Sequence, residues 1–234
     1  AGRITAVVPY YGYGRTDKKD QPRVPITARL VADMISTAGA HRFLTLDLHA
    51  GQIQGFFNIE VDEITAFYLL SDYIKKKNIP NAVVVAGDIG ATKRSRNFAQ
   101  HLDFPLAIIE KRRAQQKDGS RAEALNVIGD VKDKNCVIFD DEIDTAGTMA
   151  QAMLFLKEEK ARDIYACVTH ALLSGPAVQR LQEAPVKEVV ATNTIALPPN
   201  KNFSKLTVLS VAPLLAEVIR RVHLGISVGE LFNE

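Results

Sequence analysis

The sequence predicts an α/β protein built on parallel sheets that are covered by helices on both faces. Short runs of β-branched and apolar residues alternate with longer segments in which apolar residues recur at helical spacing. Such alternation is typical of βαβ units, which place neighbouring strands parallel. Runs such as residues 83–85 are apolar at every position, so both faces of their sheet are expected to be buried. With 47% hydrophobic residues, the 234-residue chain can form one large core or two small ones.

Each element follows from this pattern. The predicted strands are residues 4–10, 43–46, 82–85, 106–109, 136–139, 164–168 and 188–191, with a short last strand at 206–209. The predicted helices are residues 27–38, 65–77, 91–101, 148–160 and 175–182, with a last helix at 211–223.

The order of these elements predicts two domains. Residues 1–63 contain two strands and one helix, which are too few for a sheet of their own, whereas residues 64–205 contain five strands. Residues 206–234 are expected to return and complete the first domain. Only three residues precede the first strand, which is apolar enough to be central. The N-terminal part of the first domain is therefore expected to be absent.

Charge and cysteine content exclude several classes of function. The formal net charge of +2 produces no global field of the kind that attracts nucleic acid, so no nucleic-acid partner is expected. No apolar run approaches the roughly 18 residues that span a bilayer, so no membrane association is expected. Cys136 and Cys167 lie in apolar runs, where two reduced core thiols are favoured over a disulfide. A cytoplasmic location follows from that expectation.

The strongest local pattern is an apolar strand that ends in carboxylates and leads into a small, hydroxyl-rich turn. Asp140 and Asp141 end the strand, where they can accept hydrogen bonds from ribose hydroxyls or hold a cation through water. The turn that opens the next helix consists of Asp144, Thr145, Ala146, Gly147 and Thr148. Unpaired N–H groups at a helix N-terminus favour a phosphate, and the small residues let it approach. An acidic cap on a surface turn is the less favoured alternative.

A basic cluster, Lys111-Arg112-Arg113, follows the predicted strand at residues 106–109. Cations at this edge of a sheet can neutralise charge that builds up during phosphoryl transfer. Arginine suits bidentate phosphate contacts, and lysine acts as a point charge. The polar residues 114–121 suggest a loop that closes over the reaction. A solvated basic loop is the alternative.

Taken together, these segments resemble those of ribose-phosphate pyrophosphokinases. Residues 136–148 are similar to the phosphoribosyl pyrophosphate motif of type I phosphoribosyltransferases and their relatives, which does not separate transferases from the synthetase. The segments that resemble the synthetase itself are residues 9–19, 47–57, 84–94, 110–113, 215–221 and 227–232. In order, they cover essentially the whole chain.

The resemblance implies two phosphoribosyltransferase-like domains with parallel sheets flanked by helices, of which the first is incomplete. It implies an enzyme of nucleotide biosynthesis that transfers pyrophosphate from ATP to the anomeric hydroxyl of ribose 5-phosphate, giving phosphoribosyl pyrophosphate and AMP. It also implies Mg²⁺ as cofactor and a homo-oligomer, a hexamer built from dimers.

Individual roles follow from the same resemblance. Lys111 is matched to the catalytic lysine, and Arg113 to a catalytic arginine that contacts the ribose 5-phosphate. The ribose 5-phosphate site would further comprise Asp140, Asp141, Asp144, Thr145, Ala146, Gly147 and Thr148.

The nucleotide side is matched in the same way. Arg15 corresponds to the arginine that binds the adenine nucleotide, and Thr16 stands at a position where the family has glutamine. His49 would contact ATP and, with Asp88, hold Mg²⁺, through a loose or partly water-mediated contact because Mg²⁺ prefers oxygen ligands. From the residues alone, His49 could instead pack or cap, and Asp88 could cap the helix that begins at Ala91.

One departure from the family lies beside the phosphate motif, where Glu142 replaces a usually apolar residue. Two rival functions stay open. A phosphoribosyltransferase that consumes phosphoribosyl pyrophosphate leaves His49, Arg15 and the Lys111–Arg113 pair unexplained. A non-catalytic regulatory relative is expected to lose or interrupt the catalytic loop, which here is short and keeps both cations.

Overall fold

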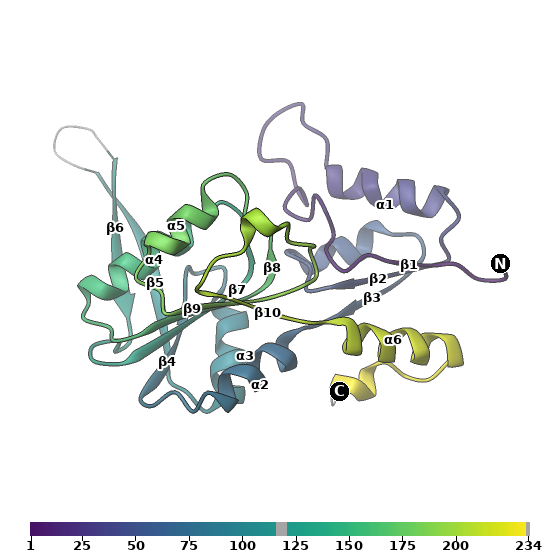
Figure 1. Cartoon of the computed structure of the whole chain (residues 1–234). Coiled ribbons are helices and arrows are strands. Elements are labelled where there is room, and N and C mark those ends of the chain that lie inside the picture. The colour runs from purple at the N-terminus through teal and green to yellow at the C-terminus, as the bar shows by residue number, and fades with distance from the viewer. Residues whose placement is uncertain (116–120, 233–234) are drawn as a thin grey trace.

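In the computed structural model, residues 1–115 and 121–232 are described, without the side chains of residues 111–124, 230 and 232. Two sheets lie next to each other (Figure 1). The smaller has the strand order β1-β2-β3, and the larger has the order β10-β9-β8-β7-β4-β5-β6. The predicted α/β class with parallel sheets is confirmed.

The small sheet is entirely parallel and is covered on both faces. It consists of β1 (Thr5–Val7), β2 (Arg42–Leu46) and β3 (Glu60–Ile64). Helix α1 (Thr27–Thr37) packs on one face around Phe43, and α6 (Ala212–Leu224) packs on the other around Leu44. A short 3₁₀ segment, η1 (Gly51–Phe56), follows β2. Strand β3 was not predicted, because charged residues alternate with its apolar ones.

The large sheet is parallel except for its last strand, β6, which runs antiparallel to β5. Its strands are β4 (Ala82–Ala86), β5 (Leu106–Gln115), β6 (Arg121–Ile128), β7 (Asn135–Ile143), β8 (Ile164–Ala171), β9 (Glu188–Thr192) and β10 (Leu206–Leu209). Its helices are α2 (Phe67–Lys76), α3 (Thr92–Leu102), α4 (Gly147–Glu158) and α5 (Ala177–Glu183). Two further 3₁₀ segments are η2 (Pro199–Lys201) and η3 (Gly229–Phe232).

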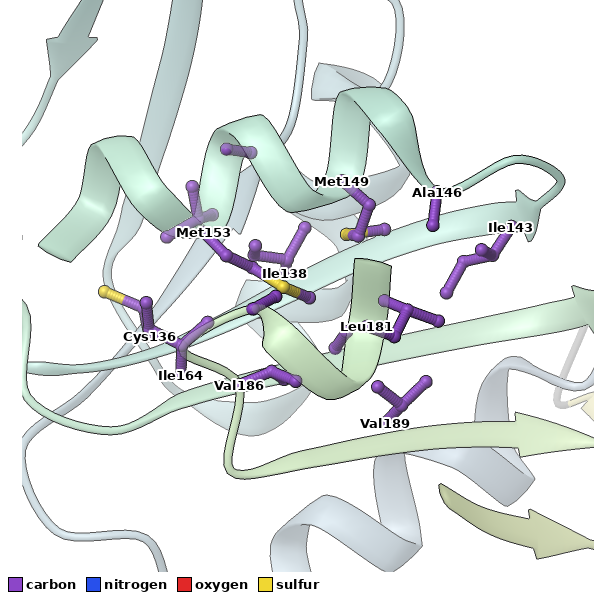
Figure 2. Packing of buried hydrophobic residues seen from close by; sticks show 14 of the residues in the cluster. Cys136, Ile138, Ile143, Ala146, Met149, Met153, Ile164, Leu181, Val186 and Val189 are labelled. Atoms are coloured by element: carbon purple, nitrogen blue, oxygen red, sulfur yellow. The ribbon is translucent and has the colours of Figure 1, made fainter. Parts of the chain in front are cut away.

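Successive residues of the apolar strands face two different cores in turn. On β7, Cys136 and Ile138 face the core under α4 and α5, whereas Val137 and Phe139 face the core formed with α2 and α3. Figure 2 shows the first of these cores, where Met153 of α4 lies over Ile138 and near Leu181 of α5. This double coverage explains why the strands are apolar at every position.

Two expectations about the strands are wrong. Strand β5 does not end at Ile109 but continues to Gln115, and β6 begins at Arg121, so both ends of the expected polar loop belong to the paired strands of a hairpin. Backbone hydrogen bonds hold such a hairpin and require no apolar pattern. Strand β10 pairs with β9 of the large sheet instead of completing the small one. The helix after it, α6, does return to the small sheet.

Two further findings bear on the expectations from composition. Cys136 and Cys167 are both free and buried, as expected. Among the described residues, no helix has both the length and the hydrophobicity that crossing a bilayer requires.

The core under α4 allows a direct test of this packing. Met153 is fully buried, whereas the next residue along the helix, Leu154, is 53% exposed. Met153→Ala should lower the free energy of unfolding by about 2–5 kcal/mol, because it removes a buried side chain and leaves a cavity. Leu154→Ala, the matched control, should change it by less than about 0.5 kcal/mol in denaturant titration. Equal losses from the two substitutions would contradict this assignment of the buried face.

Candidate active site

The carboxyl ends of β4 and β7 and the turn after β2 surround a cavity of about 410 Å³. Ligands bind at this edge in open α/β sheets. The predicted site residues that line the cavity are Arg15, His49, Asp88, Asp140, Asp141, Asp144, Thr145, Ala146, Gly147 and Thr148. The fold therefore brings together segments that lie more than a hundred residues apart in the sequence.

The turn between β7 and α4 is shaped for an anion. Ala146 adopts a left-handed conformation (φ 59°), which turns the chain directly into α4. The first N–H groups of any helix have no partner within it, so those of α4 are oriented toward a ligand at this end. Figure 2 shows Ala146 just before the helix and Met149 in its first turn, with both side chains on the side that faces the core.

Arg180 supports this turn from α5. Its Nη1 donates a hydrogen bond to the carbonyl oxygen of Thr145 (2.9 Å). A Cβ atom added at Gly147 would lie 3.4 Å from the same nitrogen, a tight contact. The small residue at 147 thus allows the guanidinium to sit beside the helix N-terminus, where it adds positive charge. No local pattern could reveal a residue 35 positions away.

Asp141 is buried between two basic side chains from different parts of the fold. Its Oδ2 lies 2.7 Å from Nδ1 of His49, and its Oδ1 lies 2.7 Å from Nη1 of Arg94 on α3. Burial alone would raise the pKa of Asp141, but the hydrogen bond with His49 and the charge of Arg94 hold that pKa below its usual range. Asp141 is therefore ionised and connects the two sheets.

The pKa of the neighbouring carboxylate, Asp140, is shifted in the opposite direction. Burial, followed by the hydrogen bond and charge of Asp141, raises the pKa of Asp140 to about 8. Its Oδ1 accepts a hydrogen bond from the backbone N–H of Asp141 (2.9 Å), and Arg94 is more distant at 3.7 Å. A cation or hydroxyl donors beside Asp140 would favour its ionised form. The pKa values of the adjacent carboxylates are thus shifted in opposite directions.

His49 and Asp88 each form a hydrogen bond within the protein through one side-chain atom. The hydrogen bond with Asp141 raises the pKa of His49 and engages Nδ1, which leaves Nε2 for a ligand. A carboxylate on the second nitrogen is the usual arrangement of metal-binding histidines. Asp88 accepts a hydrogen bond from the N–H of Ala91 (2.8 Å) through Oδ1, so it does cap the turn into α3. Its Oδ2 is not needed for that cap, and the two roles are compatible.

Arg15 and Thr16 make different contacts. Arg15 extends over the cavity to Glu142 (Nε to Oε1, 3.4 Å) and Asp144 (Nη1 to Oδ2, 3.0 Å). The Thr16 hydroxyl donates to the carbonyl oxygen of Tyr13 (2.7 Å) and accepts from the N–H of Ala28 (3.1 Å). Thr16 does not line the 410 Å³ cavity, and its hydroxyl instead holds the loop to α1.

Lys111 and Arg113 belong to β5, opposite Leu125 and Glu123 of β6. Their side chains lie outside the described part of the structure. Arg94 lines the cavity, but no role was predicted for it from the sequence. A basic residue in the first turn of the helix that follows Asp88 could have indicated one.

Comparison with known proteins completes the description. One family model, the phosphoribosyl synthetase-associated domain, matches residues 119–233, and a second, the N-terminal domain of ribose phosphate pyrophosphokinase, matches residues 1–39. A ribose-phosphate pyrophosphokinase of Caldanaerobacter subterraneus subsp. tengcongensis is 54% identical over all 234 residues, which cover 73% of its length. A ribose-phosphate pyrophosphokinase of Bacillus caldolyticus is 49% identical over 233 residues, with the same 73% coverage.

A solved structure gives the same result. The crystal structure of phosphoribosylpyrophosphate synthetase from Mycobacterium smegmatis superposes with a TM-score of 0.89 at 46% identity, over 96% of this chain and 73% of that one. About half of the residues are thus shared with these proteins over essentially the full chain. The chain belongs to the ribose-phosphate pyrophosphokinase family, whose members make phosphoribosyl pyrophosphate from ATP and ribose 5-phosphate.

Proposed function

We propose that the 410 Å³ cavity binds ribose 5-phosphate on the turn at residues 144–148, with the nucleotide and Mg²⁺ on the side of His49 and Asp88. The observation that carries this proposal is the convergence of ten of the predicted residues around one cavity. Acidic and phosphate-binding groups are separated within it. Asp140 and Asp141 lie near the end of β7, and the helix begins at Gly147, six residues after Asp141.

The sugar phosphate fits this separation. A 5-phosphate at the start of α4 would accept hydrogen bonds from the backbone and from the hydroxyls of Thr145 and Thr148. The vicinal ribose hydroxyls would then donate to Asp140 and Asp141. Arg180, through Thr145, would hold the turn in the shape that receives the phosphate.

The donor set fits Mg²⁺. Within the described residues, no three His, Cys, Asp or Glu side chains are grouped to hold a metal on their own. Mg²⁺ keeps several waters and commonly uses one or two protein ligands with substrate phosphates. His49, through Nε2, and Asp88, through its second oxygen, would hold it, directly or through water. When bound, the ion neutralises charge on the triphosphate.

Lys111 and Arg113 are proposed as the catalytic cations. The β5–β6 hairpin projects from the large sheet (Figure 1), and β5 lies next to β4, which leads to Asp88. In the reaction, the anomeric oxygen bonds to the β-phosphorus, the bond from that phosphorus to the α,β-bridging oxygen breaks, AMP leaves and the hydroxyl proton is lost. Negative charge grows on the transferred group and the leaving oxygen, where a lysine and an arginine would stabilise it.

Assembly and location belong to the same proposal. A hexamer built from dimers is what the family implies for this chain. The two free, buried thiols support a reducing compartment such as the cytoplasm. Light scattering of the purified protein measures the assembly directly.

Lys111→Ala should cripple turnover, measured as AMP formed from ATP and ribose 5-phosphate. The substitution removes a cation whose interaction grows in the transition state, which is worth roughly 3–4 kcal/mol. Calorimetry should show nearly unchanged ribose 5-phosphate binding. A variant that retains more than about a tenth of wild-type turnover would rule out the catalytic role. Absence of AMP formation by the unaltered enzyme would overturn the proposed activity of this site.

His49→Ala should raise the Mg²⁺ concentration needed for half-maximal activity more than it raises the Michaelis constant for ribose 5-phosphate. The reason is that His49 and Asp88 both line the cavity and are the residues proposed to hold Mg²⁺ with the nucleotide. Magnesium titrations at saturating ribose 5-phosphate measure the effect, with Asp88→Asn as the matched variant. A change in melting temperature alone would instead show that His49 is structural.

Thr148→Val should raise the Michaelis constant for ribose 5-phosphate by about tenfold or more and leave that for ATP nearly unchanged. It deletes one hydroxyl donor to a charged phosphate, a bond worth about 1.5–3 kcal/mol, while keeping the side-chain shape. Asp140→Asn should also weaken sugar binding, because the amide carries no charge. If both variants affected only ATP, the nucleotide and not the sugar would occupy this turn.

A further inference from the structure

Behind the active site, a hydrogen-bonded group of polar residues joins the end of β2 to the ends of β8 and β9. Thr169, His170, Thr192 and Thr194 are all buried. Buried polar groups cost free energy unless each is satisfied by a partner. None of the four lines the 410 Å³ cavity, and the proposed reaction uses none of them.

The group holds Asp47 in an uncommon conformation. Asp47 has a φ of 37°, in the left-handed region that non-glycine residues seldom adopt. Its Oδ2 accepts hydrogen bonds from the hydroxyl of Thr169 (2.6 Å) and from the N–H of Ala66 (3.0 Å). Its own N–H donates to the carbonyl oxygen of Ile64 (3.0 Å). Such a conformation persists only where several contacts hold it.

His170 binds the same turn through its main chain. Its Nε2 lies 3.1 Å from the carbonyl oxygen of Leu46 and 3.2 Å from that of Asp47, so this nitrogen must be the donor. Its Nδ1 then accepts from the hydroxyl of Thr194 (2.9 Å). Burial lowers the pKa of His170, which agrees with a neutral ring in this tautomer. The ring of Tyr10 packs against it at a centroid distance of 4.9 Å.

The turn held in this way is the one that presents His49. Only Leu48 separates Asp47 from His49, whose Nδ1 lies 2.7 Å from Oδ2 of Asp141 in the other sheet. We propose that His170 is a positioning residue for the nucleotide side of the active site, because it fixes the main chain at Leu46 and Asp47 and thereby sets where His49 stands. This inference rests on the proposed nucleotide and Mg²⁺ role of His49.

A pair of substitutions separates this role from simple packing. Glutamine can place its amide N–H₂ near the position of Nε2 and donate to the same two carbonyl oxygens, whereas leucine cannot. We expect His170→Leu to bind Mg²⁺ with α,β-methylene-ATP about tenfold more weakly in calorimetry, as for a lost buried hydrogen bond. His170→Gln should stay within about threefold of the unaltered enzyme, and ribose 5-phosphate affinity should change little in either variant.

Hydrogen exchange gives a readout that needs no ligand. In His170→Leu, amides in residues 47–57 should exchange at least tenfold faster, while those of β4 should keep their protection. Thr169→Val removes the hydroxyl that holds the Asp47 carboxylate and nearly keeps the side-chain shape. It should shift both readouts in the same direction, and it decides the question if His170→Leu does not fold.

Two results would overturn the inference. The first is a lower melting temperature of His170→Leu with unchanged nucleotide affinity and unchanged hydrogen exchange in residues 47–57. That result would show that His170 only stabilises the fold. The other is an equal loss of affinity in the leucine and glutamine variants, which excludes the hydrogen bond as the cause. His49→Ala in the same calorimetry tests the proposed role of His49 separately. Unchanged affinity there would refute that role and the nucleotide part of this inference, whereas the exchange result still decides whether His170 holds the turn.

Discussion

The rest of the active site depends on the interaction of the ionised Asp141 carboxylate with His49 and Arg94. The two partners of the carboxylate approach at 2.7 Å each, His49 from the turn after β2 and Arg94 from α3. A buried carboxylate without them would be costly, so the three groups stabilise one another only when both sheets are in place. The arrangement brings the proposed nucleotide side and the proposed sugar side of the cavity to a common edge. The hydrogen bonds of His170 and Thr169 to the β2 turn support the same contact from behind.

Charge is distributed unevenly across this edge. Three arginines are each placed by a specific oxygen: Arg94 by Asp141, Arg15 by Asp144, and Arg180 by the carbonyl of Thr145. The carboxylates gather at the end of β7, whereas the start of α4, four residues later, presents backbone N–H groups. A sugar phosphate has the same polarity, with hydroxyl donors at one end and a dianion at the other. Glu142 contacts Arg15 and so adds a local partner for the arginine that we propose binds the nucleotide.

The features that could be predicted from the sequence are those whose residues are contiguous in the chain. The parallel strands of the large sheet were recognisable because each is apolar on both faces, as residues 136–139 are, and the acidic turn was recognisable because residues 140–148 carry all its groups. Strand β3 was not predicted because the charged residues Glu60 and Asp62, which pair with Arg42, interrupt its apolar pattern. Strand β10 was assigned to the wrong sheet because the free edge of β9 is visible only once the sheet is built. Arg180 and the His170 group act across long stretches of sequence, so no local spacing could reveal them.

The most direct test of the account is a crystal structure of the enzyme with ribose 5-phosphate, Mg²⁺ and α,β-methylene-ATP. We expect the 5-phosphate at the N-terminus of α4, within hydrogen-bonding distance of residues 144–148, and the ribose hydroxyls on Asp140 and Asp141. We expect the metal and the triphosphate on the side of His49 and Asp88. A sugar phosphate bound elsewhere at saturating concentration, with residues 144–148 empty, would contradict the account.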